Sequence, residues 1–192
     1  TAIRPSPIGT STGNWNECKA GTLGARVRRG NAYFALSCNH VFARLNLASM
    51  GESILQPGRE DVGCAQTAAD TIGFLADYSP LSYSVVSPNV MDAAMVRTTT
   101  SLVSASTPTG GYGAPSSTTA APALQMAVQK YGKRTGLTKG SITAINLIIA
   151  VTYVTGTAYF TDQFAVESTS TFADGGDSGS LVVTDNQSVN PV

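Results

Sequence analysis

Charged residues are scarce in this sequence of 192 residues. They make up 12% of the chain, about half of the usual share, and 12 basic side chains balance 12 acidic ones. A formal net charge of zero offers no electrostatic attraction to nucleic acid or to an anionic membrane surface. We therefore expect neither nucleic acid nor a membrane among the partners.

Long apolar runs are missing as well. The longest, Ile145 to Val154, is interrupted by Asn146 and Thr152 and is too short to cross a bilayer. The sequence therefore predicts a soluble protein, and nothing in it identifies the compartment. Residue 1 is Thr, with no basic and apolar leader after it, which favours a processed or trimmed chain.

Residues that bind metals are few. The three cysteines, Cys18, Cys38 and Cys64, leave at least one thiol unpaired, and their spacing fits no zinc motif. One disulfide can form, but the sequence does not assign its pair. With a single histidine, His40, and no phosphate-binding glycine loop, we expect no metal and no cofactor.

The patterns that are present have a period of two, which is typical of strands. Alternation predicts a hairpin of one buried face over 23–36 with "RGN" as its turn, short strands in 70–78 and 90–97, a long strand over 145–153, a partner with Phe160, Phe164 and Val166 facing inward, and a strand over 180–184. Regularly spaced strands with glycine-rich turns indicate an all-β sandwich or barrel.

A stretch of almost uncharged Ser, Thr, Pro and Gly residues separates the two halves. It runs over 98–123 and lacks the apolar residues needed for a core of its own, so it favours a linker or a long surface crossover. We therefore predict an N-terminal β unit at 1–97 and a C-terminal β unit at 124–192.

Three residues draw attention as candidates for chemistry. His40 follows a strand, Asp92 lies among apolar residues of "NVMDAAMV", and Ser178 lies in "GGDSGS". Each alone has an ordinary structural explanation: a hydrogen-bonded histidine, an aspartate at a strand start, and a glycine-rich turn. Together they supply the alcohol, the imidazole and the buried carboxylate that nucleophilic serine catalysis requires.

The order His40, Asp92, Ser178 and the local sequences "SCNHVFA", "MDAAMV" and "GDSGS" resemble the trypsin-like serine peptidases of the chymotrypsin fold. The stretch "QKYGKRTGLTKGSITAIN" (129–146) resembles the opening hairpin of the second barrel in the bacterial and plant members of that group. There we interpret Arg134 and Lys139 as solvated turn charges.

The resemblance implies two packed antiparallel β-barrels and a serine endopeptidase acting on a peptide or protein substrate. It implies that His40 is the general base, that Asp92 orients it, and that the N–H groups of Ser178 and Gly176 form the oxyanion hole. Asp177 would hold the loop in place, and Phe172 lies where many relatives have the base of the substrate pocket.

The sequence also departs from the family after Ser178. Only residues 179–192 follow it, whereas relatives continue with strands that close the second barrel and form much of the pocket wall. We therefore expect a second barrel that is incomplete at its C-terminus. A cut chain, a second polypeptide and proteolysis after Val192 all account for this, and our hypothesis is a separate, associated C-terminal fragment.

Two other classes of function remain open. One is a catalytically inactive binding module on the peptidase fold, which an intact set of three residues disfavours. The other is a hydrolase with Thr1 as nucleophile, which is disfavoured because the sequence shows no helices to cover its strands. A non-peptide esterase would use the same three residues.

Overall fold

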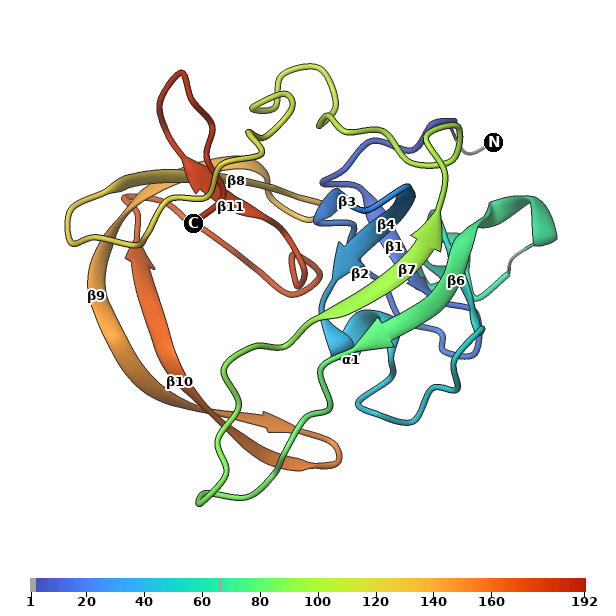
Figure 1. The fold of residues 1–192 in the computed structure, drawn as a ribbon, viewed down its shortest axis with the longest axis horizontal. Coiled ribbons are helices and arrows are strands. Elements are labelled where there is room, and N and C mark those ends of the chain that lie inside the picture. Colours follow the sequence, from blue (N-terminus) through green and yellow to red (C-terminus); the bar gives the residue numbers. More distant parts are fainter. Residues whose placement is uncertain (1–2, 66) are drawn as a thin grey trace.

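Two curled antiparallel sheets make up nearly all of the regular structure (Figure 1). The structure is a computed structural model that describes residues 3–65 and 67–192, so Thr1 lies outside the described residues. The prediction of an all-β chain of two antiparallel barrels, the second one incomplete, is confirmed. In the part of the chain that is described, no helix is long and apolar enough to cross a membrane.

The first sheet has seven strands in the order β2-β1-β5-β6-β7-β4-β3. Their bounds are β1 Ser11–Asn14, β2 Gly21–Thr22, β3 Ala25–Arg29, β4 Ala32–Ser37, β5 Ser53–Leu55, β6 Thr71–Tyr78 and β7 Ala94–Thr98. A short α-helix, α1 (Asn39–Phe42), follows β4, and two 3₁₀ turns are η1 (Arg59–Val62) and η2 (Ala68–Asp70). The core inside this sheet includes Leu23, Ile54, Ile72 and Val96, all fully buried.

The hairpin of β3 and β4 forms as predicted, but β4 is covered on both faces. Phe34 and Ala35 are adjacent and so point in opposite directions, yet they are only 4% and 0% exposed. Ala35 joins the core, whereas the ring of Phe34 lies under the guanidinium groups of Arg29 and Arg97, 5.2 and 5.6 Å from its centre. The expectation of one buried face was therefore wrong, because the guanidinium groups of Arg29 and Arg97 cover Phe34 on the other.

The second sheet has four strands in the order β10-β9-β8-β11. Their bounds are β8 Ala127–Gly132, β9 Gly136–Tyr153, β10 Gly156–Glu167 and β11 Val182–Thr184. β10 and β11 stand at opposite edges, and β9 and β10 arch away from the rest of the molecule as one long hairpin (Figure 1). Because the sheet does not close, Ile149 on the predicted inner face of β9 remains 40% exposed.

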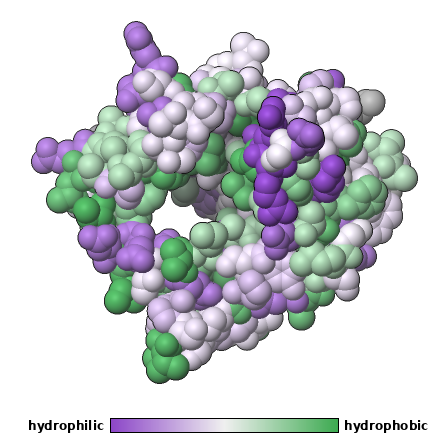
Figure 2. Space-filling model, viewed as in Figure 1, coloured by the Kyte–Doolittle hydropathy of each residue, from purple (hydrophilic) through white to green (hydrophobic). Residues whose placement is uncertain are grey.

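The segment between the two sheets, residues 99–126, contains no strand. Its first part nevertheless packs on the first sheet, since Val103 is fully buried in that core and pairs with Ser6 in a parallel bridge. Between the second sheet and the first, the space-filling view shows the molecule hollowed (Figure 2). The domain limits at 97 and 124 stay a prediction.

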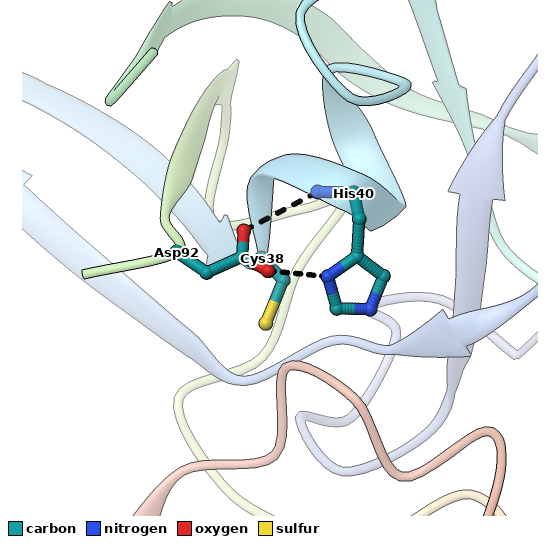
Figure 3. Close-up of side chains that lie close together, drawn as sticks. All are labelled: Cys38, His40 and Asp92. Carbon is teal, nitrogen blue, oxygen red and sulfur yellow. Dashed lines mark hydrogen bonds and ion pairs between the residues drawn. The ribbon is translucent and has the colours of Figure 1, made fainter. Parts of the chain in front are cut away.

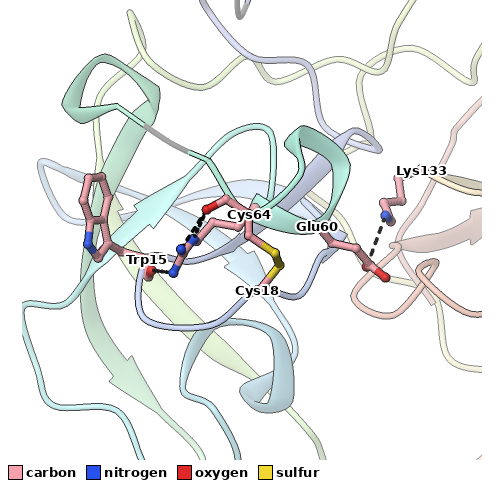
Figure 4. Close-up of a disulfide and its surroundings, with 6 residues drawn as sticks. Trp15, Cys18, Glu60, Cys64 and Lys133 are labelled. Carbon is pink, nitrogen blue, oxygen red and sulfur yellow. Dashed lines mark hydrogen bonds and ion pairs between the residues drawn. A yellow bond between two sulfur atoms is a disulfide. The ribbon is translucent and has the colours of Figure 1, made fainter.

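A disulfide joins Cys18 to Cys64, 46 residues apart in the sequence (Figure 4). The guanidinium of Arg59 supports it by donating to the carbonyl oxygens of Cys64 and Trp15, at 2.7 and 2.8 Å. Among the described residues Cys38 is the free cysteine. The disulfide that the sequence left unassigned is therefore Cys18–Cys64, and the thiol of Cys38, near His40, takes no part in it.

Candidate active site

His40 and Asp92 are brought together by the pairing of β4 with β7. Ser37 at the end of β4 lies opposite Ala94 at the start of β7, so the residues just after one strand meet the residues just before the other. His40 lies in α1, and Asp92 lies two residues ahead of β7 rather than on the strand, which corrects the expectation from the sequence. A residue outside the ladder is free to turn its carboxylate toward the imidazole.

The carboxylate of Asp92 holds both the backbone and the ring of His40. Its Oδ1 accepts the His40 N–H at 3.3 Å, and its Oδ2 is hydrogen-bonded to His40 Nδ1 (Figure 3). The second ring nitrogen points away from Asp92 (Figure 3). An imidazole held in this way presents its Nε2 outward as a proton acceptor.

A third donor to Asp92 comes from the second sheet. The hydroxyl of Tyr153, the last residue of β9, lies 3.1 Å from Asp92 Oδ2. Burial alone would raise the pKa of Asp92, but the hydrogen bonds and charge of His40, together with Tyr153, bring that pKa below its ordinary value. Sequence reasoning missed Tyr153, which the strand pattern placed only at the end of one face of the long strand over 145–153.

Ser178 lies exposed in a loop whose carbonyl groups are fixed to β2. Thr22 donates from its N–H to the Ser178 carbonyl at 2.8 Å and from its hydroxyl to the Gly176 carbonyl at 2.9 Å. Among the described residues, the N–H groups of Gly176 and Ser178 donate to no protein acceptor. Gly176 has a φ of +103°, a backbone conformation that favours glycine over residues with a side chain.

Ser178 and His40 line the same small pocket of about 90 Å³. Its other lining residues are Gly13, Lys19, Ala20, Gly21 and Val41, all from the first half of the chain. Within the described residues, no hydrogen bond joins the Ser178 hydroxyl to His40. Hydrogen bonds of this kind are often long before substrate binds.

Asp177 is the buried residue of this loop, between Gly176 and Ser178. Its carboxylate accepts the Arg134 N–H at 2.9 Å, the Thr135 hydroxyl at 2.7 Å and the Asp174 N–H at 3.1 Å, and it pairs with Lys130 Nζ at 3.2 Å. Burial would raise the pKa of Asp177, but these donors, the Thr135 hydroxyl first, lower it on balance. Asp177 thus fixes the loop, as expected, and Lys130 is the buried cation that sequence reasoning missed.

The remaining candidates from the sequence lie apart from this pocket. Phe172 follows β10, where its carbonyl accepts from Thr138 at 2.7 Å and its ring centre lies 5.8 Å from Lys130 Nζ. Arg134 and Lys139 are exposed and reach only acidic surface residues. A substrate role for Phe172 stays a prediction.

One group of described residues combines three types of metal ligand: Cys38, His40 and Asp92 (Figure 3). The His40 and Asp92 ligand atoms are already paired with each other. Burial, and then the charge of Asp92, raise the pKa of the Cys38 thiol and keep it protonated. A protonated thiol and an imidazole already paired with a carboxylate are poor ligands for a cation.

Residues 64–191 match the model of peptidase family S64. The chain belongs to peptidase family S64. A comparison with curated protein sequences finds no match. Solved structures with the same fold include Thermobifida fusca protease A, with a TM-score of 0.62 at 21% identity over 96% of this chain and 79% of that one.

Two further proteases of known structure have the same fold. Nocardiopsis protease matches with a TM-score of 0.61 at 19% identity, over 96% of this chain and 80% of that one. A glutamic acid specific serine protease that uses a histidine triad in substrate binding matches with 0.60 at 21%, over 91% and 78%. The family S64 chain is therefore a protease with the chymotrypsin-like fold of serine proteases.

Proposed function

We propose that this protein is a serine endopeptidase whose catalytic residues are His40, Asp92 and Ser178. The observation that carries the proposal is the pair of His40 and Asp92, which faces a pocket shared with Ser178. Peptides and proteins are the substrates that membership of a peptidase family favours. An inactive binding module would need none of these groups to converge.

The proposed reaction proceeds through an acyl-enzyme. His40 Nε2 removes the hydroxyl proton of Ser178 as its oxygen attacks the scissile carbonyl carbon, and the imidazolium then protonates the leaving amine. Asp92 stabilises the imidazolium and keeps the Nδ1 proton in place. Water then attacks the ester carbonyl with His40 as base again, and the peptide acid leaves as Ser178 regains its proton.

The N–H groups of Gly176 and Ser178 are the proposed oxyanion hole. Both are unused within the described residues, and the carbonyls beside them are anchored to Thr22, so the two donors are oriented before substrate arrives. Gly176→Ala keeps the backbone N–H, but its side chain strains the φ of +103° and should displace this donor. We therefore expect slower acylation, with the about 10²- to 10³-fold cost of losing one donor as the upper bound. Gly175→Ala is the matched control, because a Cβ at Gly175 meets no neighbour within 4 Å. Equal acylation rates in the two variants would contradict this assignment.

We further propose that an associated C-terminal fragment completes the second barrel. Among the described residues, β9 is the only strand that pairs with β10, and the other edge of β10 meets the chain in one parallel bridge between Asn89 and Phe160. At the opposite edge of the sheet, Val183 of β11 forms an antiparallel bridge with Pro191. Between these edges lies a cleft of about 450 Å³ lined by residues of β9, β10 and β11 and by segments next to Asp92 and Val192, many of them apolar. Sheet edges that are paired at only a few residues, beside a cleft with many apolar residues, are features that strand addition satisfies.

The decisive experiment is denaturing intact-mass spectrometry after treatment with a fluorophosphonate probe. We expect one added probe mass on the wild-type chain and none on Ser178→Ala. A second polypeptide in the spectrum is the expected sign of the fragment. An unlabelled wild-type chain in the presence of that fragment would overturn the proposed function and favour the binding module, and a labelled chain without a second species would overturn the fragment proposal alone.

A further inference from the structure

We propose that Tyr153 is a positioning residue for Asp92, so that docking of the hairpin β9–β10 on the first sheet aligns His40 for catalysis. The inference rests on the proposed function and adds a residue to it. His40 and Asp92 lie in segments next to β4 and β7 of the first sheet, whereas Tyr153 is the last residue of β9 in the second sheet. The carboxylate is therefore oriented by both halves of the molecule.

The phenol lies on the carboxylate oxygen that also holds the imidazole. Tyr153 Oη donates to Asp92 Oδ2 at 3.1 Å, and Oδ2 is the partner of His40 Nδ1. The rings of Tyr153 and His40 lie 5.7 Å apart at an angle of 46°. With the His40 N–H on Oδ1, the carboxylate has donors on both oxygens, and this restricts its rotation about the Cβ–Cγ bond.

Tyr153 is the donor in this hydrogen bond. Burial and the adjacent charge of Asp92 both raise the pKa of the phenol, so it keeps its proton throughout the pH range in which a serine protease works. An ionised carboxylate can only accept. Hydrogen bonds of a neutral hydroxyl to a carboxylate are about twice as strong as those between neutral groups.

The end of the hairpin that carries Tyr153 is fastened to the first half of the chain. The hydroxyls of Tyr83 and Thr155 lie 2.5 Å apart, and Asn89 exchanges backbone hydrogen bonds with Tyr159 and Thr161 at 2.8 and 2.9 Å. Beneath them lies an apolar cluster whose buried members are Leu45, Leu81, Ala158 and Phe160. These contacts place Tyr153 in its position while the middle of the hairpin remains open.

The test compares Tyr153→Phe with Tyr83→Phe. Both remove one phenolic hydroxyl where the end of the hairpin meets the first half of the chain, but only the first removes a donor from Asp92. We expect Tyr153→Phe to lower kcat/KM, or the rate of fluorophosphonate labelling, about tenfold through kcat with KM unchanged. Tyr83→Phe should stay within about twofold of wild type, because the backbone hydrogen bonds of Asn89 and the apolar cluster still hold this end of the hairpin.

A second readout does not depend on activity. His40 is the only histidine of the chain, so isotope-labelled imidazole gives the signals of a single ring. In a Ser178→Ala background, Tyr153→Phe should shift or broaden the proton resonance of the Nδ1–H···Asp92 hydrogen bond, and Tyr83→Phe should leave it in place. Thermal unfolding of both variants verifies that they fold.

The outcomes separate this inference from the proposed function. If Tyr153→Phe leaves both the Nδ1 resonance and kcat as in wild type, the positioning role is wrong even though the enzyme is active. If both variants lose rate equally, the hydroxyls only hold the hairpin and the inference is again overturned. A third outcome is a wild-type chain that neither cleaves peptides nor reacts with the probe, while its Nδ1 resonance responds to Tyr153→Phe and not to Tyr83→Phe. That outcome refutes the proposed function but supports the hydrogen bond from Tyr153 to Asp92.

Discussion

Lys130→Met is the most informative perturbation of the nucleophile loop. The side chains of Lys130 and Asp177 are each 2% exposed, and their charged atoms lie 3.2 Å apart. Removing one partner of such a pair typically costs about 3 to 5 kcal/mol, because the other charge stays buried without compensation. Asp177 keeps its donors from Arg134, Thr135 and Asp174, so we expect the lower end, about 3 kcal/mol.

The assay is urea unfolding as a function of pH, with Lys139→Met as the matched control. Lys139 lies on β9, the strand that pairs with β8, which carries Lys130. Its side chain is 58% exposed, and its surface pair with Asp185 is worth about 1 kcal/mol or less. Since the folded-state pKa of Asp177 is lowered, its carboxylate stabilises the fold above about pH 4, and this contribution fades as the pH falls further. The cost of Lys130→Met should therefore shrink below about pH 4 as Asp177 becomes neutral.

Labelling of Ser178 provides the functional half of the same experiment. Asp177 lies between Gly176 and Ser178, so a shift of its carboxylate moves both proposed oxyanion donors. Lys130→Met should slow labelling by fluorophosphonate at pH 7, and Lys139→Met should not. A loss of stability below about 1 kcal/mol, or one equal to that of Lys139→Met at every pH, would refute the reasoning.

Two further predictions concern the first sheet. Burial by itself raises the pKa of Glu52, but hydrogen bonds, those from Arg44 first, lower it from 4.5 to about 2. Glu52→Gln should thus reduce the free energy of unfolding by about 1 to 2 kcal/mol at pH 7, a difference that disappears as the pH falls from 4.5 toward 2 in pH-dependent urea unfolding. Replacing Cys18 and Cys64 by serine should reduce the free energy of unfolding by about 2 to 4 kcal/mol, and a reductant should bring the wild-type chain to the same level but leave the variant unchanged.

Much of this protein is determined by local sequence. The alternating residues of 23–36 specify the β3–β4 hairpin because a period of two places one set of side chains on the core face. The glycines of "GGDSGS" specify a loop with free N–H groups because only glycine adopts the backbone angles found at Gly176 and Gly179. The types and chain order of His40, Asp92 and Ser178 were enough to select them as the proposed catalytic residues.

Only the tertiary structure decided which distant groups meet. Tyr153 reaches Asp92 across 61 residues of sequence, and Cys18 selects Cys64 rather than Cys38 because of where β1 and η1 bring the chain. Nothing in the local sequence around Lys130 indicates that it is buried. Its charge is compensated by Asp177, 47 residues further along the chain, and only the fold brings the two together. Local pattern gives strands and turns through short-range sterics, whereas these contacts depend on how two curled sheets pack against each other.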